Sequence, residues 1–336
     1  MPRFGKWRER LLAGRSRVLR GLSASTLFVA VVLLAATGPV AADGETVFNV
    51  RIINQDSSSW TTWYSPPDPN NPFVAVAAGD WDGNGLIDTA YSFTASGTYY
   101  LKVIAPSGSE IGSRTVPYPV RYAAMGDGNT DGKWEIMYVR SCNGGAGECA
   151  YVWHYGLTPW LVFQSNERMM VAMGDWNHDG KADTAYTLLI GGTRYIKVDD
   201  PSGSNLMSWT AETRPIWSLA MGDVNSDVYD ELMYSTQTFP SEAWIINHDL
   251  TSAKLKSSTN YLMAVAIGNW DNVGKKDTAY SWSAGSIHYA LIVNPSGGTL
   301  LQKTMCSVAY EMAFGNFTGD SRQELLYSDL DYSCPT

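Results

Sequence analysis

The stretch at residues 79–91, GDWDGNGLIDTAY, decides the fold, because related stretches recur along the whole chain. The other copies are GDGNTDGKWEIMY (126–138), GDWNHDGKADTAY (174–186), GDVNSDVYDELMY (222–234), GNWDNVGKKDTAY (268–280) and GNFTGDSRQELLY (315–327). Successive copies begin 46 to 48 residues apart. A period in this range indicates a repeat architecture, in which each repeat is one supersecondary unit.

Two positions around this stretch are identical in all six copies. An alanine stands two residues before the leading glycine, at Ala77, Ala124, Ala172, Ala220, Ala266 and Ala313. A tyrosine stands twelve residues after that glycine, at Tyr91, Tyr138, Tyr186, Tyr234, Tyr280 and Tyr327. The alanine predicts a strand crowded by its neighbours, and the tyrosine predicts a repeated packing position with its hydroxyl bonded at an edge.

Each repeat has the pattern of four short strands. In the first repeat these are residues 73–79, 89–94, 98–105 and 109–116, with the turn Pro106-Ser107-Gly108 between the last two. Such segments are rich in β-branched, aromatic or small apolar residues and end at turn signals. Four short strands in about 47 residues are typical of a β-propeller blade.

The two ends of the chain complement each other. The sixth repeat stops soon after its second strand, while residues 46–53 and 59–64 provide two strand-like segments before the first repeat. We therefore predict an all-β, six-bladed β-propeller of four-stranded blades. In this fold the N-terminal strands complete the last blade, which removes the exposed sheet edges of an open array.

The repeats also alternate. Repeats one, three and five have Asp-Thr-Ala-Tyr at the end of the loop, at Asp88, Asp183 and Asp277. Repeats two, four and six have a glutamate there, at Glu135, Glu231 and Glu324. This alternation indicates an ancestral unit of two repeats, present three times.

Residues 1–42 have the pattern of a secretory signal peptide, which makes residues 43–336 a single β-propeller domain. Seven basic residues and one acid precede an apolar run at 27–36 and the small-x-small sequence Val40-Ala41-Ala42. The alternative is an uncleaved anchor, for which the apolar run is short. We expect a secreted, extracellular protein that is not inserted in a membrane after cleavage.

Charge and cysteine content agree with export. The chain has 24 basic and 33 acidic residues, so removal of the signal peptide leaves a net charge near −15. Such an acidic surface argues against nucleic acid as a partner. The four cysteines predict disulfides Cys142–Cys149 and Cys306–Cys334 in an oxidising compartment, with metal ligation as the weaker alternative because no C-x-x-C spacing occurs.

The recurring loops carry oxygen ligands at alternate positions. Positions are numbered from the residue after the glycine. Carboxylates or amides fill positions 1, 3, 5 and 9, and a backbone carbonyl is expected at position 7. The predicted ligands are Asp80, Asp82, Asn84, Leu86 and Asp88 in loop one; Asp127, Asn129, Asp131, Lys133 and Glu135 in loop two; Asp175, Asn177, Asp179, Lys181 and Asp183 in loop three; and Asp223, Asn225, Asp227, Tyr229 and Glu231 in loop four. Hard oxygen ligands of this number suit Ca²⁺ better than Mg²⁺, so we expect about four calcium sites.

Loops five and six are degraded copies. Asn269 and Asn316 replace the first aspartate, Val273 removes a ligand from loop five, and Thr318 replaces one in loop six. Loop four has Val228 where loops one to three have a glycine, which predicts a weaker site. The alternative for every loop is a polar turn that binds only its own backbone.

These repeats resemble FG-GAP/VCBS repeats, the family that includes the propeller head of integrin α chains and many exported bacterial proteins. The resemblance covers residues 45–334 and rests on the loop pattern D-x-[DN]-x-[DN]-G-x-x-[DE]. It implies Ca²⁺ bound in the hairpin between the first two strands of a blade. The departures are loops five and six and a count of six, where seven is common.

Three functions remain open from the sequence. The first is a non-catalytic binding module for carbohydrate or a surface ligand, with Trp81, Trp176 and Trp270 as a threefold set of stacking platforms; the alternative for these side chains is packing over the neighbouring blade. The second is a protein-interaction or adhesion scaffold. The third is a polysaccharide lyase or hydrolase, which is disfavoured because the four histidines are scattered and no catalytic motif appears.

Overall fold

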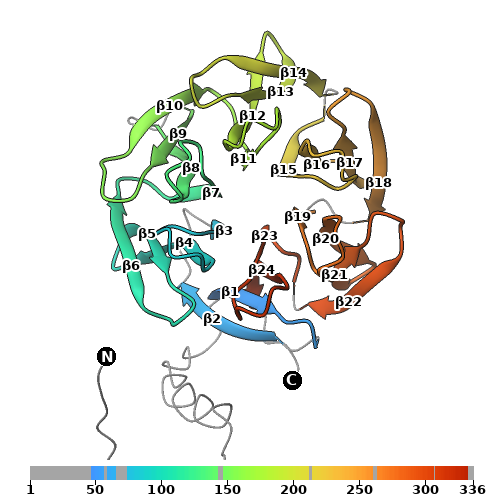
Figure 1. Cartoon of the computed structure of the whole chain (residues 1–336), viewed down its shortest axis with the longest axis horizontal. Helices are drawn as coiled ribbons and strands as arrows, with labels where there is room; N and C mark the ends of the chain where they lie inside the picture. Colours follow the sequence, from blue (N-terminus) through green and yellow to red (C-terminus); the bar gives the residue numbers. More distant parts are fainter. Residues whose placement is uncertain are drawn as a thin grey trace, which may run out of the picture. The chain divides into compact units, whose positions relative to one another are not determined.

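The computed structural model describes residues 47–56, 59–65, 74–142, 147–211, 214–259, 263–305 and 307–331. Within these ranges 24 strands form six four-stranded antiparallel sheets, and no residue is helical. The sheets stand as blades around a common centre (Figure 1). The predicted six-bladed β-propeller is therefore confirmed.

The blades follow the chain in order, with the first strand of each nearest the centre (Figure 1). Blade one contains β3 (Val76–Gly79), β4 (Asp88–Ala95), β5 (Thr98–Ile104) and β6 (Glu110–Val116). Blade two contains β7 (Val120–Gly126), β8 (Glu135–Ser141), β9 (Glu148–Trp153) and β10 (Trp160–Ser165). Blade three contains β11 (Val171–Gly174), β12 (Asp183–Ile190), β13 (Thr193–Asp199) and β14 (Asn205–Ala211).

Blades four and five repeat this order. Blade four contains β15 (Ile216–Gly222), β16 (Glu231–Thr236), β17 (Ser241–Ile246) and β18 (Ser252–Ser258). Blade five contains β19 (Val265–Gly268), β20 (Asp277–Ala284), β21 (Ile287–Val293) and β22 (Thr299–Met305).

Blade six closes the ring with strands from both ends of the chain. It contains β23 (Glu311–Gly315), β24 (Glu324–Asp331), β1 (Val47–Ile53) and β2 (Ser59–Ser65). Strand β1 pairs antiparallel with β24 over its whole length, from Val47 opposite Asp331 to Ile53 opposite Leu325. The predicted completion of the last blade by N-terminal strands is confirmed, and it gives β24 a partner on its outer side.

The invariant alanines line a central cavity of about 360 Å³, at the ends of the inner strands that lead into the loops. The glycine that follows each alanine by two residues is equally confined. A Cβ atom on Gly79 would lie 2.8 Å from the Cβ of Met125 in the next blade, and one on Gly174 would lie 2.7 Å from that of Met221. The same steric conflict exists at Gly126, Gly222, Gly268 and Gly315. Small residues are therefore required where adjacent inner strands approach most closely.

The invariant tyrosines are buried in all six blades, as the sequence predicted. Tyr186 shows the hydroxyl contact most clearly, because its Oη donates to Asp199 Oδ2 at 2.6 Å. Tyr186 thus contributes a large apolar ring to the core while its polar end is bonded within the sheet.

Backbone hydrogen bonds join the loops of successive blades. The N–H at position 8 of one loop donates to the carbonyl at position 1 of the loop before it, as in Trp134 to Asp80 (2.9 Å) and Ala182 to Asp127 (2.8 Å). The same bond links loop four to loop three, loop five to loop four and loop six to loop five. These bonds hold the loops in register at one end of the ring.

The disulfide Cys142–Cys149 is present and joins the end of β8 to β9. Cys306 and Cys334 lie outside the described residues, as do the predicted signal peptide and its cleavage position. In the part of the chain that is described, no helix is long and apolar enough to cross a membrane.

Candidate functional site

The six loops form two structural classes. We call loops one, three and five the odd loops, and loops two, four and six the even loops. In both classes the acid at position 9 is buried, and one of its oxygens accepts a hydrogen bond from the backbone N–H at position 2. The classes differ in the partner of the second oxygen.

Loop one shows how the ligand positions converge. Asp80 Oδ1 accepts hydrogen bonds from the backbone N–H groups of Gly83 (2.9 Å) and Asn84 (3.0 Å), and its Oδ2 accepts one from Gly85 (2.7 Å). Carboxylate oxygens of Asp80, Asp82 and Asp88 lie within 4.8 Å of one another. The backbone bonds fix Asp80 as a polar turn would, but they do not explain why three carboxylates gather at one point.

The unexplained atom is the second oxygen at position 9 of every odd loop. Oδ2 of Asp88, Asp183 and Asp277 accepts the N–H of Trp81 (2.9 Å), Trp176 (2.9 Å) and Trp270 (2.8 Å), respectively. Oδ1 of the same three aspartates is buried and has no hydrogen-bond partner among the described residues. Buried carboxylate oxygens without a partner are costly, and a bound cation or an ordered water compensates this cost.

The cost of burying these three aspartates is seen in their raised pKa values. Burial, with smaller contributions from the neighbouring Asp82 and Asp80 carboxylates, raises the pKa of Asp88 to about 7. Burial raises the pKa of Asp183 to about 7 and that of Asp277 to about 6, again with help from an acid in the same loop. Desolvation and like charge both disfavour the ionised form, and both effects are reversed by a cation.

The even loops provide an internal donor for the second oxygen. The side chain at position 3 donates to Oε1 of the glutamate: Asn129 to Glu135 (2.9 Å), Asn225 to Glu231 (2.6 Å) and Thr318 to Glu324 (3.0 Å). Glu231 remains strongly desolvated, and burial raises its pKa to about 7.

Positions 5 to 7 have the same backbone arrangement in loops one to four. The backbone N–H at position 7 donates to the side chain at position 5 in each of them, from Leu86, Lys133, Lys181 and Tyr229. At position 6 the backbone is left-handed, with φ of 84° at Gly85, 80° at Gly132 and 83° at Gly180. Val228 has φ of 77° at this position, a conformation that strains a β-branched residue. Among loops one to four, position 6 is therefore strained in loop four alone.

The prediction of tryptophan stacking platforms is wrong. Trp81, Trp176 and Trp270 are 1%, 3% and 4% exposed, so none of them offers a ring face to a saccharide. Trp81 instead packs against Trp153 and Tyr155 of blade two, with ring centroids 4.8 and 5.9 Å apart. Packing over the neighbouring blade was the alternative, and the structure shows that arrangement.

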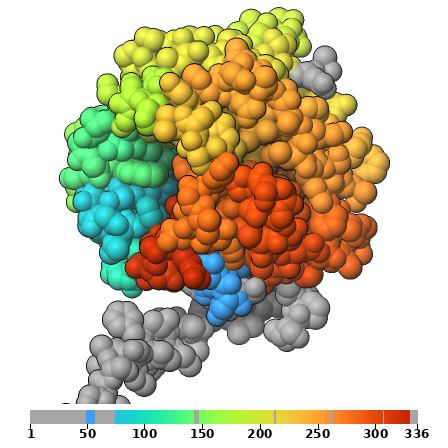
Figure 2. All heavy atoms as spheres, turned by 45° about the vertical axis from the view of Figure 1, so that its right-hand side comes forward, coloured from blue at the N-terminus to red at the C-terminus, as the bar shows by residue number. Residues whose placement is uncertain are grey.

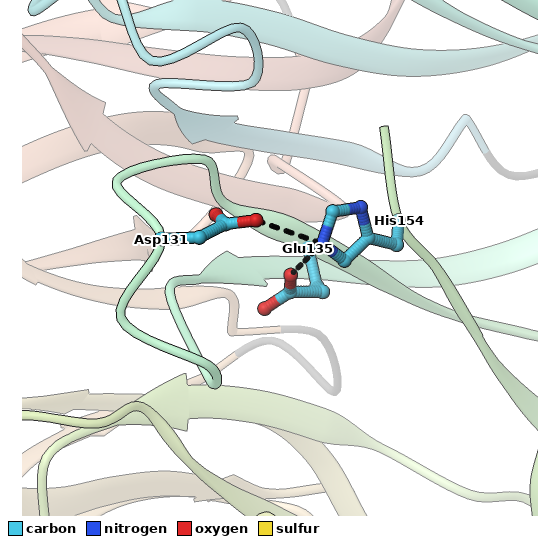
Figure 3. Close-up of side chains that lie close together, drawn as sticks. All are labelled: Asp131, Glu135 and His154. Atoms are coloured by element: carbon cyan, nitrogen blue, oxygen red, sulfur yellow. Dashed lines mark hydrogen bonds and ion pairs between the residues drawn. The ribbon is translucent and has the colours of Figure 1, made fainter. Parts of the chain in front are cut away.

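His154 was missed in the sequence because it is remote from any loop motif. It follows β9 and reaches loop two, where its Nε2 faces Asp131 and Glu135 (Figure 3). Antiparallel pairing places the residue after the third strand of a blade beside that blade's loop. The pairing register of the blade would therefore have identified His154 as a neighbour of loop two.

The central cavity opens among the loops. Besides the invariant alanines, its lining includes charged or polar residues from positions 1, 7 and 8: Asp127, Asp175, Lys181, Asp230, Lys276 and Gln323. A hollow is visible near the centre of the ring, between the green and orange blades (Figure 2). Its volume, about 360 Å³, is at the lower end of the range for small-molecule sites.

Comparison with known proteins supports the fold and leaves the family undecided. No family model matches the chain, and no curated protein matches it. A protein of unknown function from Bacteroides caccae is similar in structure, with a TM-score of 0.51 and 12% identity over 80% of this chain and 98% of that one. A triple mutant of AofleA from Arthrobotrys oligospora has a TM-score of 0.49 and 10% identity over 74% of this chain and 79% of that one. The resemblance to FG-GAP/VCBS repeats stays a prediction.

Proposed function

We propose that this chain is a secreted, calcium-binding β-propeller that acts as a non-catalytic binding module. The propeller fold suits a binding or interaction scaffold, since it holds loops and a central cavity on a rigid ring. The observation that carries the calcium proposal is the unpartnered Oδ1 of Asp88 and of Asp183. In loop one, carboxylate oxygens of Asp80 and Asp82 lie within 4.8 Å of an oxygen of Asp88.

Loops one and three are the principal calcium sites in this proposal. Each has three carboxylates, one amide and a left-handed glycine, and each leaves one buried oxygen without a protein donor. Ca²⁺ takes six to eight oxygen ligands, some of them water, which fits a loop of this composition. Loop four is a weaker site because of Val228 and the Asn225 donor.

The partner in this proposal is a hydroxyl-rich ligand, such as carbohydrate, or a polar patch of an extracellular surface protein. The cavity lining supports it, because carboxylates, lysines and an amide stand around small apolar side chains at the loop end of the ring. A few polar groups on an apolar wall are the usual composition of a ligand site.

Thermal melting in EDTA, and then with added Ca²⁺ or Mg²⁺, tests the proposal. A ligand that binds only the folded state at about 100 times its Kd adds about 2.7 kcal/mol per site. With two principal sites, we expect Ca²⁺ to raise the melting temperature by roughly 10 °C and Mg²⁺ to raise it much less. No difference between EDTA and Ca²⁺ would show that the loops are polar turns. If Ca²⁺ raises the melting temperature, glycan screening in the presence of Ca²⁺ is the next experiment.

A further inference from the structure

Loop two differs from every other loop through one side chain of its own blade. His154 Nε2 lies 3.1 Å from Asp131 Oδ2 and 3.3 Å from Glu135 Oε1 (Figure 3). The pairing register places equivalent residues immediately after the third strand of the other blades, at Ala105, Asp200, Asn247, Asn294 and Asn54. None of these is a histidine, so the nitrogen ligand breaks the symmetry of the ring at a single place.

The imidazole ring is held in one orientation. Its Nδ1 lies 3.1 Å from the carbonyl oxygen of Tyr155, which accepts the Nδ1–H, so that Nε2 is the nitrogen that faces loop two. The residues on both sides of His154 are fixed by Trp81 of blade one, which packs against Trp153 and Tyr155. Metal-ligating histidines are oriented in this way, by a carbonyl or carboxylate at the other ring nitrogen.

Nε2 faces two carboxylate oxygens, one from Asp131 and one from Glu135. Nε2 lies within hydrogen-bond distance of Asn129 Nδ2, at 2.8 Å, and of Asp131 Oδ2, at 3.1 Å. His154 and Glu135 have side-chain exposures of 16% and 6%, while Asp131 is at the surface with 43%. His154 and Glu135 are therefore largely buried, while the exposed Asp131 leaves the cluster open to ions from solvent.

We propose that Asp131, Glu135 and His154 bind Zn²⁺, with water as the fourth ligand, in place of the Ca²⁺ that the loop sequence predicts. One imidazole nitrogen and two carboxylates are a donor set for zinc, whereas Ca²⁺ takes oxygen ligands. Tetrahedral zinc with ligands about 2.0 Å away places neighbouring ligand atoms about 3.3 Å apart. The distances from Nε2 to the two oxygens, 3.1 and 3.3 Å, match this spacing. An ion at this point replaces the Asn129 hydrogen at Nε2.

Calorimetric titration of the EDTA-stripped chain with Zn²⁺, in the presence of excess Ca²⁺, tests this site. We expect one equivalent to bind, and His154→Gln to weaken its affinity by at least about 100-fold, since even outer partners of metal ligands contribute 10- to 100-fold. His178→Gln is the matched control, because His178 is an exposed histidine in loop three. It should bind Zn²⁺ as the parent does.

Two outcomes would overturn the proposal. One is Zn²⁺ binding that His154→Gln leaves unchanged. The other is no Zn²⁺ binding by a parent chain that His154→Gln destabilises, which would make the cluster a hydrogen-bonded network. Co²⁺ absorption gives a second measurement, with the tetrahedral spectrum expected in the parent and His178→Gln but not in His154→Gln. The Ca²⁺ melting response of loops one and three is measured separately, so the two proposals can fail independently.

Discussion

The odd and even loops have the same backbone plan and solve the same electrostatic problem in different ways. Both bury an acid at position 9 and give its first oxygen a backbone donor. The even loops give the second oxygen a side-chain donor from position 3, whereas the odd loops leave it without one among the described residues. We therefore expect the odd loops to depend on a cation more than the even loops do.

The difference comes from the residues at positions 3 and 9. Glutamate is long enough for Oε1 to reach the amide or hydroxyl at position 3, as Glu231 reaches Asn225 at 2.6 Å. Aspartate is shorter, and in loop three Asp183 Oδ1 has no donor although Asn177 stands at position 3. In loops one and five position 3 is itself an aspartate, Asp82 or Asp271, whose carboxylate cannot donate. The alternation of aspartate and glutamate at position 9 thus accompanies a difference in whether the second carboxylate oxygen has a hydrogen-bond donor.

Removing the odd-loop acids should have the largest effect. We expect the double variant Asp88→Asn, Asp183→Asn to lose most of the Ca²⁺-dependent rise of roughly 10 °C, because each site loses its buried negative ligand. In EDTA the variant should melt at or above the parent temperature, since two desolvated charges have been removed. Scanning calorimetry with and without Ca²⁺ measures both effects.

The control for this variant is Glu324→Gln in loop six. Glu324 is buried at the same position, but both of its oxygens have donors, Phe317 N–H and Thr318 Oγ1. It should keep the Ca²⁺ response. A double variant with an undiminished response to Ca²⁺ would place the ion elsewhere and would remove the distinction between the loop classes.

Much of this organisation was predictable from the sequence. Close internal repeats predicted the blades, and the strand-like segments before Ser65 predicted closure, because both follow from local pattern and chain order. The tryptophans at position 2 were misassigned, since a loop position says nothing of whether a side chain turns outward or packs against the next blade. The contact of His154 with Asp131 and Glu135 depends on strand register between β8 and β9, which a motif within one loop does not contain.

The pH dependence of stability in EDTA should show the next largest effect. Burial raises the folded-state pKa of Asp88 and Asp183 from 3.8 to about 7, so the folded state binds more protons than the unfolded state between these values. Stability should therefore fall as the pH rises from about 4 to about 7. Glu231, with its pKa raised to about 7, acts in the same direction.

Saturating Ca²⁺ should reduce this fall, because the ion compensates the ionised aspartates. The double variant in EDTA should show a shallower fall than the parent, with the remainder due to Glu231 and the other buried acids. Melting temperatures at several pH values provide the measurement. Stability that rises with pH over this interval in EDTA would contradict the assignment of these aspartates as desolvated, uncompensated groups.

The smallest effect is expected when an even loop is changed to resemble an odd loop. Asn225→Ala removes the donor to Glu231 Oε1 and leaves that oxygen buried without a partner, at a cost of about 1–3 kcal/mol in EDTA. Asn177→Ala is the matched variant, because its amide nitrogen does not donate to Asp183 and only its bond from the Asp179 N–H is lost. It should cost about 1 kcal/mol or less. Urea unfolding in EDTA compares the stabilities of the two variants.

The response to Ca²⁺ gives a second comparison. If the internal donor substitutes for a cation in loop four, adding Ca²⁺ should stabilise Asn225→Ala more than it stabilises the parent. Equal costs and equal calcium responses for the two asparagine variants would mean that the position-3 donor has no special role in the even loops.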